Sequence, residues 1–204
     1  MSLVLFLSMA LNMLDMQPAP FHNGDIENGW YASPIVKIGQ VANNQGVFVG
    51  AQGGWVINHR FVLGGKGYML TNPFEMDGLQ NISVGFGCGG IFTEYIISSN
   101  QLFHFSVENM MGIGGVYNDV KNYNAYSTPI NYTGDACFVI EPGVNLNFNL
   151  SRNFQITAGV NYRFVGGIDY DGGVKNGVEV DYHNLSNTDF SGLSFQMEFK
   201  FGRF

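Results

Sequence analysis

His104, Ser106 and Glu108 are the three residue types of an acyl hydrolase, and they follow one another at a spacing of two. In such enzymes an acid orients a histidine, which takes a proton from the serine nucleophile. Alternate residues of a strand share one face, but their Cα atoms lie about 7 Å apart, and no nucleophile elbow surrounds Ser106. We therefore expect no enzyme, and we keep an acyl hydrolase built on these three residues as the alternative.

Other chemical motifs in the sequence are weaker. Residues 85–90 (GFGCGG) fit the pattern G-x-G-x-x-G, but no helical pattern follows, so we expect no dinucleotide site. The four histidines lie far apart in the sequence, so a metal cluster is not expected. The acidic segment 169–184 could collect divalent cations weakly, although a solvated loop is the simpler interpretation. We expect no cofactor and no metal.

Composition narrows the fold class. The chain has 204 residues, with 9 basic and 16 acidic side chains, a net charge of −7, 28 glycines and 15% aromatic residues. Only 12% of the residues are charged, which with this aromatic content argues against disorder. Interior glycines cost a helix about 1 kcal/mol each relative to alanine, so a helical bundle is unfavourable. The acidic balance excludes a basic nucleic-acid interface.

The N-terminal segment has the features of an export signal. Residues 3–11 (LVLFLSMAL) form an apolar run of signal-peptide length, and the breaker-rich QPAP follows. We expect a signal peptide at 1–17, a periplasmic segment at 18–30 and the folded domain at 31–204, with a buried or disordered N-terminus as the alternative to the signal. No other stretch approaches 18 apolar residues, so a membrane protein of this sequence could only be a β-barrel.

A period of two dominates the chain after residue 31. In residues 138–150 and 154–164 apolar side chains alternate with Asn, Gln, Thr and single charges. This alternation predicts eight strands, near residues 32–41, 46–56, 60–71, 81–97, 102–117, 135–150, 153–168 and 189–203. The polar face is small and rich in amides, as in the interior of a small barrel whose apolar face meets lipid. The expected fold is all-β, an eight-stranded antiparallel up-and-down transmembrane β-barrel.

The connections between these strands alternate in length. Short turns near residues 57–59, 98–101 and 151–153 alternate with long loops at 72–80, 118–134 and 169–188, which predicts an outer-membrane barrel with both termini in the periplasm. Nine acids lie in these loops or directly beside them, against Lys121 and Lys175, so the outer face should be acidic. Aromatic residues at the strand ends predict interfacial belts, with Trp30, Tyr31 and Trp55 at the periplasmic edge and Tyr68, Tyr117 and Tyr170 at the outer edge.

The alternation also predicts a charged lumen. The inward residues are Lys37, Lys66, Glu94, Glu108, Glu141, Arg163, Glu198 and Lys200, four bases and four acids. Glu94 joins them if a bulge at Gly89 and Gly90 changes the phase of its strand, which leaves Cys88 facing lipid. The turn at 151–153 sets Glu141 opposite Arg163 and predicts an ion pair between them. We also expect Glu94 beside His104. A structural network that fills the lumen is favoured, and a gated ion path is the alternative.

Several strings resemble small, mostly uncharacterised outer-membrane β-barrel proteins of the Bacteroidetes type, within the porin-like superfamily of Gram-negative bacteria. They are GGWVINHRFVLGGKGY (53–68), EYIISSNQLFHFSV (94–107), EPGVNLNFNLSRNFQITAGVNYRFVGG (141–167) and FKFGRF (199–204). Phe204 resembles the final Phe that the barrel-insertion machinery reads, although the apolar residues before it are out of phase with it by one. Some barrels of this kind are lipid-modifying acyl hydrolases, which is the precedent for the enzyme alternative.

The expected function follows from these patterns and the resemblance. We expect a monomeric, non-enzymatic protein of the outer membrane with a structural or surface-interaction role carried by acidic extracellular loops. Its partners would be outer-membrane lipids, the insertion machinery and an unknown extracellular partner. The alternatives are the lipid-modifying acyl hydrolase and a barrel that binds a small apolar ligand, which requires an apolar inner face.

Overall fold

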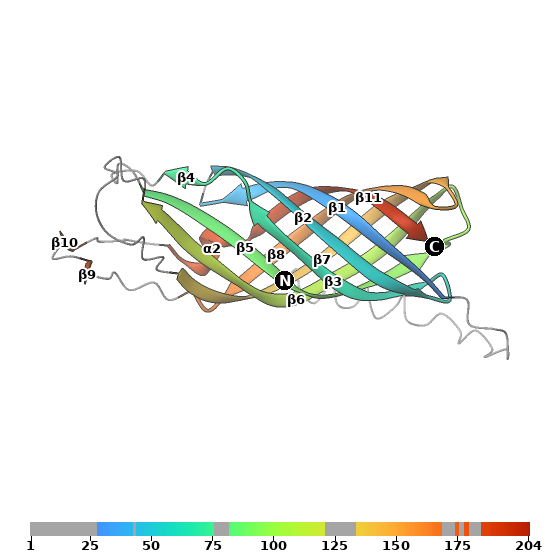
Figure 1. The fold of residues 1–204 in the computed structure, drawn as a ribbon, viewed down its shortest axis with the longest axis horizontal. Helices are drawn as coiled ribbons and strands as arrows, with labels where there is room; N and C mark the ends of the chain where they lie inside the picture. The colour runs from blue at the N-terminus through green and yellow to red at the C-terminus, as the bar shows by residue number, and fades with distance from the viewer. Residues whose placement is uncertain are drawn as a thin grey trace, which may run out of the picture.

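The computed structural model describes residues 28–42, 44–75, 82–120, 134–168, 174–175, 178–179 and 185–204, so the expected signal peptide lies outside the described residues. Long antiparallel strands form a closed barrel (Figure 1). They are β1 (Asn28–Val41), β2 (Asn44–Ile57), β3 (Phe61–Leu70), β5 (Ile82–Ile97), β6 (Phe103–Val120), β7 (Gly134–Ser151), β8 (Phe154–Gly166) and β11 (Gly192–Arg203).

Apart from the first and last strands, β1 and β11, which pair with each other, the barrel strands neighbour those next to them in sequence. The order is β3-β2-β1-β11-β8-β7-β6-β5, and pairing of β3 with β5 closes the ring. The up-and-down eight-stranded barrel expected from the alternation is therefore confirmed. β1 begins four residues before the expected strand start at residue 32, because Asn28 to Trp30 already pair with Ile57 to Trp55 of β2.

The two ends of the barrel differ. At one end, here called the turn end, tight turns at residues 58–60, 98–102 and 152–153 connect the strands, and β11 finishes there (Figure 1). Asn58, His59 and Ser98 have positive φ in these turns. At the other end, here called the loop end, lie β4 (Phe74–Glu75), β9 (Val174–Lys175), β10 (Val178–Glu179) and the short helix α2 (Asn187–Phe190).

Side-chain orientation follows the predicted alternation. In β8, Gln155, Thr157 and Asn161 point inward and are buried, whereas Val160 and Tyr162 are exposed on the outside. The exterior is apolar around the barrel, as expected for a protein whose solvent is lipid, and the interior combines polar and charged side chains with a buried apolar cluster that includes Phe48, Phe86 and Phe92. A barrel that binds an apolar ligand needs an inner face free of charges, whereas Lys37, Glu141, Arg163 and Glu198 are buried inside this one, so that alternative does not fit this structure. Within the described residues, no helix is long and apolar enough to cross a membrane.

The expected bulge at Gly89 and Gly90 is wrong. β5 pairs with β6 in one unbroken register from Ile82 to Ile97. From Val84 to Ile96 the even-numbered residues therefore point inward, and Glu94 reaches the lumen without a change of phase. Cys88 has the same parity, so it faces the lumen and not lipid, and it packs partly buried against the interior.

Candidate functional site

The lumen holds all eight charged residues that the alternation assigned to it. Lys37, Lys66, Glu94, Glu108, Glu141, Arg163, Glu198 and Lys200 are each buried. They come from seven strands, and three of the four cations lie within ion-pair distance of a carboxylate. Burying an isolated charge is costly, so this pairing is what makes a charged interior compatible with folding.

Glu94 is the centre of the cluster nearest the turn end. Its carboxylate accepts hydrogen bonds from Lys200 Nζ at 2.8 and 3.0 Å, from Ser106 Oγ at 2.6 Å and from Tyr31 Oη at 2.7 Å. Ser106 Oγ in turn accepts from Asn147 Nδ2 at 2.8 Å. The carboxylate therefore has donors on both oxygens, as a buried anion requires.

Glu108 is the centre of the middle cluster. Lys66 Nζ lies 2.6 Å from Glu108 Oε1, and the amides of Asn145, Asn161 and Gln196 donate to the same carboxylate at 3.0, 2.7 and 2.9 Å. Gln196 also donates to Glu198 at 2.7 Å, which links this cluster to the Glu94 cluster nearest the turn end. Amides supply both a donor and an acceptor, so they can connect charged groups of either sign.

Glu141 lies nearer the loop end, and its partners differ from the expected one. Lys37 and Tyr68 donate to its two oxygens, and Lys66 Nζ lies 3.7 Å away. The strand register is the predicted one, with Asn147 opposite Thr157. The predicted ion pair of Glu141 with Arg163 is nevertheless wrong: in a narrow lumen a long side chain reaches the opposite wall, and Lys37 of β1 takes the place that the register had assigned to Arg163.

Arg163 closes the loop end of the lumen. Its Nε donates to the carbonyl oxygen of Phe190 at 2.6 Å and its Nη2 to that of Gln40 at 3.3 Å. The guanidinium carbon lies 4.6 Å from the ring centroid of Phe48 and 4.9 Å from that of Phe86, within the range of cation–π attraction. Helix α2 thus lies against the loop end of the barrel, with the fully buried Phe190 ring stacked on Phe86.

Sequence reasoning missed several members of this network. Tyr31 and Tyr68 were assigned to the interfacial belts, but both are buried and donate to Glu94 and Glu141. Gln52, which donates to Glu198 at 2.7 Å, was not singled out. The alternation could have placed both tyrosines in the lumen. Tyr31 is an even number of positions from Lys37 in β1, and Tyr68 is an even number from Lys66 in β3, so each shares the inward face of its strand. Trp30 and Trp55 do lie on the outside, and Tyr170 lies outside the described residues.

His104, Ser106 and Glu108 do not form a catalytic triad. Ser106 Oγ donates to Glu94, whereas His104 Nδ1 lies 3.3 Å from Gln101 O and its Nε2 3.3 Å from Gln155 Nε2. Glu108 belongs to the Lys66 cluster. The expectation that Glu94 lies beside His104 is also wrong, because the register of β5 and β6 sets Glu94 opposite Glu108. Spacing by two along one strand holds the three groups too far apart for proton transfer.

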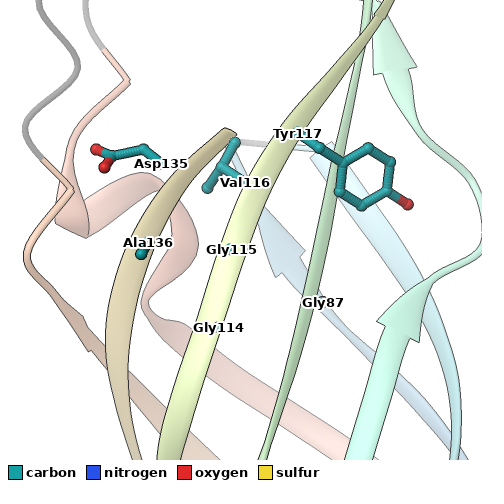
Figure 2. Close-up of a pocket in the computed structure, with 7 residues that line it drawn as sticks. All are labelled: Gly87, Gly114, Gly115, Val116, Tyr117, Asp135 and Ala136. Atoms are coloured by element: carbon teal, nitrogen blue, oxygen red, sulfur yellow. The ribbon is translucent and has the colours of Figure 1, made fainter. Parts of the chain in front are cut away.

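Two further features concern possible ligands. In the described part of the chain, no group of three or more His, Cys, Asp and Glu residues could hold a metal ion. An open pocket of about 400 Å³ lies near the loop end on the outside of the barrel wall (Figure 2). It is lined by Gly87, Gly114, Gly115, Val116, Tyr117, Asp135 and Ala136. Small residues paired across β5, β6 and β7 make this hollow, which offers little polar chemistry.

The closed up-and-down barrel, apolar outside and charged inside, defines the class of small outer-membrane β-barrels. Three solved structures share this fold at a TM-score of 0.50. The N-terminal β-barrel domain of Pseudomonas aeruginosa OprF is 10% identical, and the comparison covers 87% of this chain and 99% of that one. Neisserial surface protein A is 12% identical, with 88% and 99% covered. Pseudomonas aeruginosa OprG is 7% identical, with 86% and 95% covered. No protein-family model and no curated protein matches the sequence.

Proposed function

We propose that this protein is a non-enzymatic outer-membrane barrel with a structural or surface-interaction role, in which the strands and lumen act as a rigid support for the acidic loops. The observation that carries the proposal is the pairing of carboxylates with lysines in the lumen. Glu94, Glu108 and Glu141 each have a lysine partner within the barrel, so these charges need no substrate to compensate them. A rigid, closed support leaves the variable loops as the surface for a partner.

The loop end supports this proposal in two ways. Strands β6 and β7, each of 18 residues, reach far toward that end, and α2 is held there by the hydrogen bond from Arg163 to Phe190. The loops and the ends of the elements that border them carry Glu75, Asp77, Asp119, Asp135, Asp169, Asp171, Glu179, Asp181 and Asp189. Such a concentration of one charge favours a partner with a basic surface.

Two measurements test the membrane placement and the orientation. The full-length protein should be recovered in the outer-membrane fraction, and unboiled samples should migrate differently from boiled ones. A membrane-impermeant amine reagent applied to intact cells should label Lys121 and Lys175 and spare the buried Lys37, Lys66 and Lys200. Labelling restricted to broken cells would contradict the proposed orientation.

A third measurement tests the surface role. Proteoliposomes that carry the protein should bind fluorescent poly-lysine, and replacing Asp169, Asp171 and Asp181 with Asn should weaken that binding. Three replacements of uncharged loop residues, Asn122→Ser, Asn124→Ser and Asn131→Ser, are the control. Equal binding by the neutralised and control variants would contradict a role for the acidic loops.

The enzyme alternative has its own test. Purified protein refolded in detergent would be incubated with lipid A and phospholipids, and release of fatty acids would be measured. We expect none, because Ser106 is hydrogen-bonded to Glu94 and no histidine among residues with a described position bonds to it. Fatty-acid release that disappears in Ser106→Ala would establish the hydrolase instead.

A further inference from the structure

Three of the four arginines of this chain lie at the turn end. Arg60 lies in the turn between β2 and β3, Arg152 lies in the turn between β7 and β8, and Arg203 ends β11. All three are exposed, whereas the fourth, Arg163, is buried in the lumen. The described residues of the turn end include no exposed Asp or Glu side chain. The turn end is therefore a basic rim on an acidic protein.

The backbone holds these arginines in fixed places. Arg60 N donates to Ile57 O at 3.1 Å, and Arg60 O accepts from Ile96 N of β5 at 2.6 Å. Asn153 and Gly202 exchange two hydrogen bonds of 3.0 Å, which join the β7–β8 turn to the end of β11. Arg152 and Arg203 are the chain neighbours of that joined pair, so two like charges are held in the same part of the rim.

None of the three guanidinium groups has an ion-pair partner among the described residues. Like charges held near one another without an acid between them repel, and a shared anion would relieve that repulsion. The guanidinium group is planar and presents paired N–H donors that match the oxygens of phosphate. Arginine at all three positions, where lysine would give the same charge, therefore favours a phosphate partner.

Aromatic residues place this rim at the membrane surface. Trp30 and Trp55 are opposite each other in β1 and β2, point outward and are each 62% exposed. Arg203 lies opposite Trp30 on the other side of β1. Tryptophan concentrates at the level of lipid headgroups, and an arginine beside it reaches phosphates at that depth.

We propose that Arg60, Arg152 and Arg203 form a binding rim for the phosphate groups of anionic phospholipids in the leaflet at the turn end. This inference rests on the proposed membrane placement. It assigns opposite roles to the two ends of the barrel: the turn end attracts anionic lipid, and the acidic loop end repels it.

The tryptophans provide the test, because Trp30 and Trp55 are the only two in the chain and both lie at this rim. The full-length protein is inserted into phosphatidylcholine vesicles that contain either brominated phosphatidylglycerol or brominated phosphatidylcholine at the same mole fraction. Bromine quenches nearby tryptophan fluorescence. We expect the brominated anionic lipid to show about threefold preferential binding at low salt, the size of one exposed ion pair, and less at high salt.

Matched variants assign that preference to the rim. Arg60→Gln, Arg152→Gln and Arg203→Gln together should bring the ratio to one, whereas the three Arg→Lys replacements, which keep the charge but lose the paired N–H donors, should retain only part of the preference. Asp25 and Glu27 precede β1 and lie outside the described residues, so Asp25→Asn with Glu27→Gln serves as a second control that should keep or raise the ratio.

The outcomes separate the two proposals. A wild-type ratio of one in inserted protein would overturn the lipid assignment and direct attention to a soluble polyanion or a protein partner. A preference that survives the Gln replacements would overturn it as well. Protein that shows no heat-dependent gel shift in these vesicles would contradict the membrane placement itself.

Discussion

Arg163 Nε donates a hydrogen bond of 2.6 Å to the carbonyl oxygen of Phe190, a residue 27 positions away at the end of α2. This bond ties α2 to β8 of the barrel wall. Ser191 Oγ accepts from Val165 N at 3.0 Å, and Asn187 Oδ1 accepts from Ile168 N at 2.8 Å, so α2 is held along the end of β8 by side chain and backbone together.

The Phe190 ring is expected to stabilise the packing of α2 against the barrel. Phe190→Ala removes a buried ring that stacks on Phe86 and should lower the free energy of unfolding by about 3–5 kcal/mol. Phe190→Leu keeps most of the volume and should cost less than about 1.5 kcal/mol. Urea unfolding in vesicles, followed by the gel shift, measures both. Equal losses of unfolding free energy for the Ala and Leu variants would show that packing of the ring does not hold α2 in place.

The Glu141 carboxylate is expected to be essential for the stability of the barrel only while Lys37 and Tyr68 remain buried beside it. Glu141→Gln leaves Lys37 buried without its carboxylate and should destabilise the barrel by about 3–5 kcal/mol. The combination Lys37→Met, Glu141→Met and Tyr68→Phe removes both charges and the hydroxyl group, so it should recover most of that loss. Unfolding free energies of the single and combined variants provide the comparison. A combined variant less stable than Glu141→Gln would contradict this account.

Ser106 is expected to matter for stability and not for chemistry. Ser106→Ala removes the donor to Glu94 and the acceptor for Asn147, and it should cost about 1–3 kcal/mol. Ser106→Thr keeps a hydroxyl group and is the matched control. Urea midpoints test the stability, with fatty-acid release measured on the same samples. Stability unchanged in the alanine variant, together with lost hydrolysis, would favour the enzyme alternative.

Gly90 of β5 and Gly112 of β6 lie opposite each other, and this pair is expected to allow the close approach of the two strands. A Cβ atom added at Gly112 would lie 2.2 Å from the backbone oxygen of Gly89 and 2.6 Å from Gly90 Cα, so the strands would have to move apart. Gly112→Ala should therefore cost about 1–3 kcal/mol. Gly166→Ala, where no atom lies within 4 Å, is the control and should fold normally. The fraction of heat-shifted protein after refolding reports the difference.

The sequence by itself determined the barrel, because each strand must alternate when one side meets lipid and the other a polar interior. That constraint is local and repeats every two residues, so the strand number, the inward position of Glu141 or Lys200 and the β7–β8 register are readable without coordinates. Parity also assigns Tyr31 and Tyr68 to the lumen, where aromatic type alone suggested the membrane edge.

Only the tertiary structure decided which inward groups meet. Glu141 and Arg163 are opposite in the register, yet Glu141 pairs with Lys37 across the lumen and Arg163 turns to Phe190. Partners across a lumen depend on barrel closure, strand tilt and side-chain length, and none of these is encoded in the alternation of one strand. The joining of Asn153 to Gly202, which brings Arg152 and Arg203 to one part of the rim, depends on the same closure.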